Sequence, residues 1–127
     1  PEPRPAADGL REASGGEGGV TMKIIGTLPN RMVFVNGQAL DPKPSQKVFN
    51  HSPDGFSWGY NGSGPAQLAL ALTIKAAEIS GIPFEELRPY YQHVKSKFVA
   101  TWPIDEPIDG EFDIVEFLED MVGKVET

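Results

Sequence analysis

The chain has 127 residues, no cysteine, and 18 acidic against 11 basic side chains, which gives a net charge of −7. This length suits one domain built around a single core. The lack of cysteine excludes disulfide scaffolds, thiol catalysis and thiolate metal sites. The excess of negative charge argues against binding to a nucleic-acid polymer. With only two histidines present, we also expect no metal site and no cofactor.

Residues 1–20 are expected to form a flexible arm. Leu10 and Val20 are their only large aliphatic residues, and such a segment cannot bury enough surface to offset its ordering entropy. No apolar run approaches the roughly 18 residues that span a bilayer, and the arm lacks the apolar stretch of a signal peptide. We therefore expect no contact with membranes and a cytoplasmic location.

The first half of the remaining chain predicts strands. Residues 21–27 and 31–35 are rich in β-forming residues, and Asn36-Gly37 between such segments is the strongest short signal for a hairpin. Residues 38–40 would return as its partner strand. The prolines of the following Asp-Pro-Lys-Pro segment cannot donate to a β-ladder.

Two more short strands are expected before the helical part of the chain begins. They cover residues 46–51 and 56–60, separated by a Ser-Pro-Asp-Gly turn. In the second strand, Phe56, Trp58 and Tyr60 would share one face and form an aromatic platform.

From Pro65 the pattern becomes helical. Residues 65–80 are rich in strong helix formers and end before Gly81, so they predict a central, buried helix. On a helical wheel, Gln67, Ala71, Lys75 and Glu78 fall in one narrow stripe of this otherwise apolar helix. Two further helices are expected, the last over residues 114–122. The segment 101–127 carries nine acids against one lysine, so this final helix is acidic.

The predicted fold class is therefore α+β: a small, mainly antiparallel sheet from residues 21–60, packed on the central helix and two further helices. Residues 21–127 form a single domain in this interpretation.

A glycine-rich turn leads directly into the central helix. The first turn of a helix exposes unpaired N–H groups and carries about half a positive charge, so such an approach can hold a phosphate or a carboxylate. Ser63 or Gly64 could cap the helix, and Gln67 could fold back to a backbone N–H. The same residues are also what any tight strand-to-helix connection with a proline start would use, and this interpretation is the stronger one. The Gly-Lys-Ser/Thr ending of a Walker loop is absent.

His51 lies within thirteen residues of Asp54 and Ser63, which invites a catalytic interpretation. Nearness in sequence says little about geometry, and no strained nucleophile elbow is present. A histidine just before a turn more often satisfies local backbone groups. We predict no catalytic residue.

The stretch 51–70 reads HSPDGFSWGYNGSGPAQLAL. It resembles the hallmark HSPxGFxWGYxGSGPAQLAL of a small prokaryotic and phage family of unknown function, and it departs at Asn61, where glycine is more usual. The resemblance implies a shared fold, a phage or mobile-element setting, and an aromatic strand and glycine-rich loop that act as one unit. A virion-associated location is the alternative to the cytoplasm of a prokaryotic host.

The favoured function is a non-enzymatic binding module for an anionic small molecule or a nucleotide, with an aromatic ring stacked on the base. The predicted ligand-binding residues are His51, Trp58, Tyr60, Asn61, Gly62, Ser63, Gly64 and Gln67. The alternative is a structural or assembly protein that contacts a protein partner, or further copies of itself, through the arm and the acidic C-terminal helix. An enzyme acting through His51 ranks last.

Overall fold

The computed structural model describes residues 20–126, with side chains as far as Gly123. The arm expected at residues 1–20 therefore lies, except for Val20, outside the described residues.

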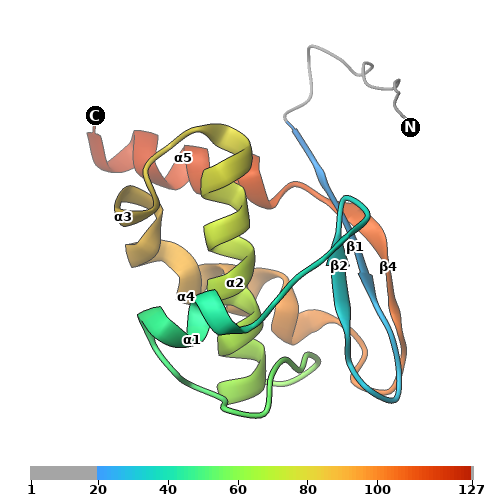
Figure 1. Cartoon of the computed structure of the whole chain (residues 1–127). Coiled ribbons are helices and arrows are strands. Elements are labelled where there is room, and N and C mark those ends of the chain that lie inside the picture. The colour runs from blue at the N-terminus through green and yellow to red at the C-terminus, as the bar shows by residue number, and fades with distance from the viewer. Residues whose placement is uncertain (1–19, 127) are drawn as a thin grey trace.

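A four-stranded antiparallel sheet forms one side of the molecule (Figure 1). Its strands are β1 (Met22–Gly26), β2 (Val33–Val35), β3 (Gln38–Ala39) and β4 (Ile108–Phe112), in the order β3-β2-β1-β4. Asn36 and Gly37 have φ angles of 51° and 84°, which is the positive pair that a type I′ turn requires. The predicted hairpin is confirmed.

The other regular elements are helices, joined by loops and turns. The elements are α1 (Lys43–Val48), α2 (Ser63–Ser80), α3 (Phe84–Leu87), the short 3-10 helices η2 (Arg88–Tyr90) and η3 (Val99–Thr101), α4 (Tyr91–Lys97) and α5 (Ile114–Glu126). In Figure 1, α2 runs through the middle of the helical part and α5 crosses behind its upper end. Gly81 ends α2 with a φ angle of 78°, as expected of a left-handed C-terminal glycine.

A single apolar core joins the sheet to the helices. Met22 and Ile24 of β1 are fully buried, whereas Lys23 between them is exposed, so one face of the sheet packs inward and the other faces solvent. Leu68 and Leu72 of α2 belong to the same buried cluster. The predicted α+β class, with an antiparallel sheet and a buried central helix, is confirmed.

The extent of the sheet differs from the prediction. Its fourth strand, β4, comes from residues 108–112 and pairs with β1 from Met22↔Phe112 to Gly26↔Ile108. The sheet is therefore not confined to residues 21–60. Local pattern could not reveal this pairing because the two strands are more than 80 residues apart in sequence.

The strands predicted at 46–51 and 56–60 are wrong. Residues 43–48 form α1, in which Pro44 occupies the first turn, where a helix tolerates proline because no N–H bond is required there. Residues 56–60 form no strand. Gly59 turns the chain with a φ angle of 90°, so Trp58 is buried, Tyr60 is 43% exposed, and the two rings do not share a face.

None of the helices within residues 20–126 combines the length and the apolar character needed to cross a membrane.

Candidate functional site at the amino end of α2

Gln67, in the first turns of α2, is a fully buried polar side chain. Its Oε1 accepts hydrogen bonds from the backbone N–H groups of His51 and Ser52, over 2.7 and 2.9 Å. Its Nε2 donates to Ser45 Oγ and to the carbonyl oxygen of Phe49, over 2.9 and 3.1 Å. Because an amide has two donor hydrogens and one oxygen with two lone pairs, Gln67 is fully satisfied. It attaches both α1 and the turn after α1 to the central helix.

The glycines that precede α2 allow the chain to pack closely. A Cβ atom on Gly64 would lie 2.6 Å from Ser57 Cβ and 3.1 Å from Tyr60 Oη, and one on Gly62 would lie 2.6 Å from Tyr60 Cε2. Gly64 is buried. One side of the first turn of α2 is therefore covered by Ser57 and Tyr60 of the protein itself.

The opposite side of this turn remains open to solvent. Asn61 and Ser63 are exposed, and Tyr60 as a whole residue is 43% exposed. The N-cap of α2 is Gly62, and the helix has no side-chain cap and no acidic residue in its first turn. The first turn of this 18-residue helix therefore supplies no negative charge of its own at the positive end of the helix.

Trp58 lies apart from this group. Its ring is fully buried and packs on the end of the sheet, where a Cβ on Gly26 would come within 2.9 Å of Trp58 Cη2. Its indole N–H donates to the carbonyl oxygen of Glu106 over 3.1 Å, and the Arg31 guanidinium lies 4.6 Å from the ring centroid. Trp58 would have to leave the core to stack on a ligand.

His51 is half-buried beside two aromatic rings. Phe49 stacks on the imidazole with ring centroids 4.4 Å apart, and Nε2 shares a 2.7 Å hydrogen bond with Tyr91 Oη. Burial, together with the positive charge of Lys95, lowers the pKa of His51 below its ordinary value of 6.5. The neutral imidazole is therefore favoured in the fold.

The eight predicted site residues thus divide into three groups. Gln67 and His51 meet in one hydrogen-bonded cluster behind the turn, residues 60–64 form the turn itself, and Trp58 lies in the core. Within residues 20–126, no three His, Asp or Glu side chains converge as metal ligands would.

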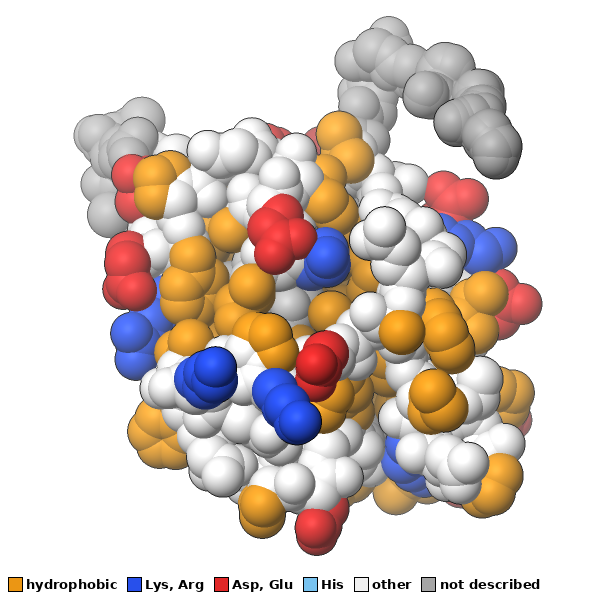
Figure 2. Space-filling model, viewed as in Figure 1, with side chains coloured by type: hydrophobic (Ala, Val, Ile, Leu, Met, Phe, Trp, Pro, Cys, Tyr) orange, Lys and Arg blue, Asp and Glu red, His pale blue; other side chains and the backbone are white. Residues whose placement is uncertain are grey.

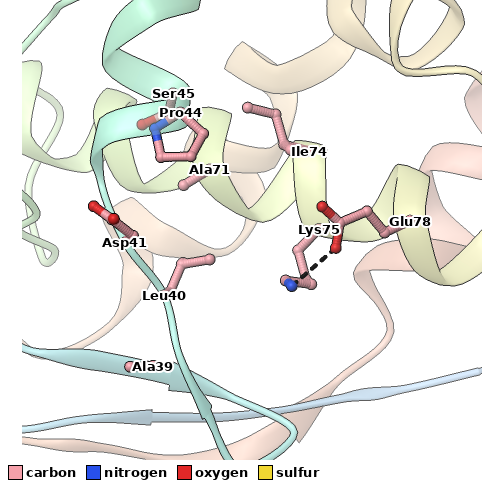
Figure 3. A pocket seen from close by; sticks show the side chains of 9 residues that line it. All are labelled: Ala39, Leu40, Asp41, Pro44, Ser45, Ala71, Ile74, Lys75 and Glu78. Atoms are coloured by element: carbon pink, nitrogen blue, oxygen red, sulfur yellow. Dashed lines mark hydrogen bonds and ion pairs between the residues drawn. The ribbon is translucent and has the colours of Figure 1, made fainter.

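A groove that the predicted site did not include lies farther along α2. Its cavity has a volume of about 180 Å³. Figure 2 shows its apolar floor near the centre of this face, surrounded by charged side chains of both signs. The lining residues, drawn in Figure 3, are Ala39, Leu40, Asp41, Pro44, Ser45, Ala71, Ile74, Lys75 and Glu78.

The charged side chains of the groove are partly engaged with the protein. Lys75 Nζ and Glu78 Oε1 are 2.9 Å apart, which uses one of the three ammonium donors. Asp41 accepts a hydrogen bond from the backbone N–H of Lys43. Ser45 donates to the carbonyl oxygen of Pro42 and accepts from Gln67, so its hydroxyl is not free to attack a substrate.

Comparison with protein families gives one match. The model of a family of unknown function, DUF6166, matches residues 26–120. The chain belongs to the DUF6166 family. The matched region of this DUF6166 domain contains the turn before α2, the groove and β4. Neither the curated proteins nor the solved structures contain a match to the chain.

The groove had a signal in the sequence. Ala71, Lys75 and Glu78 belong to the narrow stripe of α2 that begins at Gln67, and in the DUF6166 domain this stripe faces α1 and the groove. Charged residues on a helix that is otherwise buried indicate an opening in the packing. The opposite wall, from Leu40 to Ser45, had no such signal because α1 was not predicted.

Truncating Gln67 is expected to destabilise the domain strongly. The Gln67→Ala variant removes four hydrogen bonds to buried or part-buried groups, leaves the Ser52 N–H without its partner and opens a cavity beside α1. An unsatisfied group alone costs about 1–3 kcal/mol, so the free energy of unfolding should fall by about 3 kcal/mol. Urea denaturation measures this loss. Gln92→Ala, at an exposed position of α4, is the control and should change stability by less than about 0.5 kcal/mol. A loss below about 1 kcal/mol in Gln67→Ala would contradict the role of Gln67.

The lowered pKa of His51 predicts a specific pH dependence. The unfolded chain binds a proton at His51 near pH 6.5, whereas the folded protein binds it only at lower pH. The contribution of neutral His51 to stability is therefore complete above about pH 6.5 and is lost as the pH falls through the folded pKa. An NMR titration of the imidazole should have its midpoint below 6.5, and Lys95→Gln should raise that midpoint. A midpoint at or above 6.5 in the folded protein would exclude this environment.

Proposed function

We propose that this DUF6166 domain is a non-enzymatic binding module and that its principal ligand site is the groove between α1 and α2. The observation that carries the proposal is a cavity with a mixed apolar and polar lining, which has a charged pair of the central helix at its edge. Lys75 and Glu78 lie at the edge of this cavity, and the Lys75 side chain is 25% exposed. Ligand pockets commonly combine an apolar lining with a few polar groups that orient the ligand.

The size of the cavity limits the ligand. An apolar cavity of about 150 Å³ holds benzene, so a cavity of about 180 Å³ suits an apolar body of about six to eight non-hydrogen atoms. A complete nucleotide is larger than this volume and would extend out of the open groove into solvent. Among anionic ligands, we therefore favour a small aliphatic carboxylate over a nucleotide for this site.

The charge of the ligand follows from Lys75. Its ammonium has donors beyond the one that Glu78 accepts, so a ligand carboxylate can bind it while its carbon chain contacts Leu40, Ala71 and Ile74. Glu78 competes with such a ligand for Lys75. Removing the Glu78 charge should therefore strengthen binding, and removing the Lys75 charge should weaken it.

Binding of hexanoate tests this site, with hexanol and hexylamine as matched uncharged and positively charged ligands. NMR shift changes should cluster at Ala71 and Ile74, with a Kd of about millimolar for hexanoate and weaker binding of the other two. Lys75→Met should raise the Kd about tenfold or more, since a charge-assisted hydrogen bond contributes about 1.5–3 kcal/mol, and Glu78→Gln should lower it.

Lys47→Met removes a charge from α1 outside the groove and serves as the control, with no change in Kd. Equal binding of hexanol and hexanoate, or an unchanged Kd in Lys75→Met, would reject the groove as a carboxylate site.

The open side of the turn before α2 is a second candidate site. It is favoured by the absence of any acidic residue in the first turn of the helix, combined with the exposed Ser63 and Tyr60. A phosphate group could bind the first N–H groups of α2 there, with the Tyr60 ring beside a base. This proposal retains the predicted nucleotide ligand and assigns any stacking to Tyr60 rather than to Trp58.

Replacing Ser63 by an acid tests this second site. Ser63→Asp places the protein's own carboxylate at the positive end of α2 and should stabilise the domain by about 0.3–1 kcal/mol. It should also abolish any rise in Tm caused by a nucleoside monophosphate in scanning fluorimetry. The neutral variant Ser63→Asn should keep the response, and so should Lys75→Met. A nucleotide response that is equal in Ser63→Asp and Ser63→Asn would rule this site out.

The resemblance of residues 51–70 to a phage-associated hallmark supports a phage or mobile-element setting as part of the same proposal. An assembly role, through the arm and the exposed acids Glu119 and Asp120 of α5, is the alternative to ligand binding.

A further inference from the structure

The outer edge of β4 has unpaired backbone groups. Both backbone groups of Lys23 bind Asn36: its carbonyl oxygen accepts from the Asn36 backbone N–H over 2.8 Å, and its N–H donates to the side-chain Oδ1 of Asn36 over 2.9 Å. The backbone of Lys23 therefore faces β2. Alternate residues of an antiparallel strand face opposite neighbours, so Ile24 faces β4 and pairs with Gly110.

The same alternation applies along β4. Ile108, Gly110 and Phe112 direct their backbone groups toward β1, and Asp109 and Glu111 direct theirs away from the sheet. No backbone hydrogen bond from the described residues reaches these outward groups of Asp109 and Glu111. Figure 1 shows β4 as the outermost strand on this side of the sheet. The other edge strand, β3, has only two residues.

The side chains along this edge are acidic and exposed. Five acids occur within the nine residues 105–113, and all five are exposed: Asp105, Glu106, Asp109, Glu111 and Asp113. Of these, Asp109 forms an ion pair with Lys23, with Oδ1 3.5 Å from Nζ. Glu111 accepts a hydrogen bond from Thr21 Oγ1. The sequence Ile-Asp-Gly-Glu-Phe is also a poor strand former, because Asp, Gly and Glu are depleted in strands.

The acidic side chains of β4 favour pairing with a basic strand over pairing with a second copy of β4. Antiparallel pairing of two β4 strands would place the acids of one copy opposite those of the other, and like charges directly opposite are destabilising. Lys or Arg residues two positions apart on an incoming strand would instead lie opposite Asp109 and Glu111. On the other face of β4, Gly110 has no side chain, and the ring centroids of Phe112 and Trp102 are 4.9 Å apart. The residue between the two basic residues of the incoming strand would lie opposite Gly110 and beside these apolar rings.

We propose that β4 binds an extended basic segment of a partner protein as a fifth strand of the sheet, with Lys or Arg at alternating positions. Main-chain hydrogen bonds to Asp109 and Glu111 provide the attachment, and the alternating charges set the register. This mode of recognition is β-strand addition to an exposed edge. It is independent of the groove and of the turn before α2.

The test compares two seven-residue peptides of identical composition, titrated into the full chain and followed by NMR. One peptide has three Lys at alternating positions, and the other has the three Lys contiguous. The alternating peptide should shift the backbone amides of residues 108–112 and bind at least tenfold more tightly than the contiguous one. Methylation of the peptide nitrogens that face β4 should abolish its binding.

Two variants of the protein separate the contribution of the backbone hydrogen bonds to peptide binding from that of the Glu111 charge. Glu111→Pro removes an outward N–H, and an edge strand tolerates proline at such a position, so binding should weaken about tenfold or more with the ladder to β1 intact. Glu111→Gln keeps the N–H and should weaken binding less, with a smaller dependence on salt. Circular dichroism checks the fold of both, and the methylated peptide provides the backbone test on the unchanged protein if Glu111→Pro does not fold.

Three outcomes would overturn the proposal. Equal binding of the two peptides would indicate unspecific charge attraction. No binding of either would indicate that the acids only prevent the edge from pairing. Dimerisation of the full chain that Glu111→Pro abolishes would indicate that the edge pairs with a second copy.

Discussion

The buried amide of Gln67 is the constraint on which the arrangement around α2 depends. All four of its hydrogen-bonding positions are used. They bind Ser45 of α1, Phe49 at the C-cap of that helix, and His51 and Ser52 in the turn that follows. A helix of six residues, such as α1, is not stable alone in water. Its position against α2 therefore depends on contacts of this kind, and so does the groove whose wall it forms.

The Gln67 hydrogen bonds, together with close packing around them, explain much of the stretch that resembles a family hallmark. The backbone N–H groups of His51 and Ser52 bind Gln67, Gly64 allows Ser57 and Tyr60 to lie against the first turn, and Trp58 fills the core below Arg31. These are requirements of packing and of buried polar groups. The surfaces proposed for recognition lie mainly elsewhere, on the polar stripe of α2 and on β4. The stretch 51–70 is thus explained mainly by what the fold requires, and the ligand and partner sites that we propose are centred on positions around it.

Local chemistry predicted those elements whose signals lie within a few residues. The Asn36-Gly37 turn needs two positive φ angles, which these residues adopt readily, and residues 65–80 contain strong helix formers followed by Gly81. Local pattern failed for α1. Its two prolines suggested an interrupted extended chain, but at the start of a helix proline loses no hydrogen bond, and Ser45 and Gln46 are held by Pro42, Gln67 and Ser52. The contact that attaches this helix to the rest of the fold, from Gln67 to Ser45, joins residues 22 positions apart in sequence.

The sequence alone determined the α+β class, the hairpin, the buried central helix and its polar stripe, because each follows from the period of apolar residues or from the preferences of a single turn. Only the tertiary structure decided that β4 joins β1 and that Trp58 faces the core while Tyr60 faces solvent. It also decided that all hydrogen-bonding groups of the Gln67 amide bind the protein itself. These outcomes depend on pairing and burial between residues 15 to 90 positions apart. No local preference encodes which of two distant segments will satisfy a buried polar group or an open strand edge.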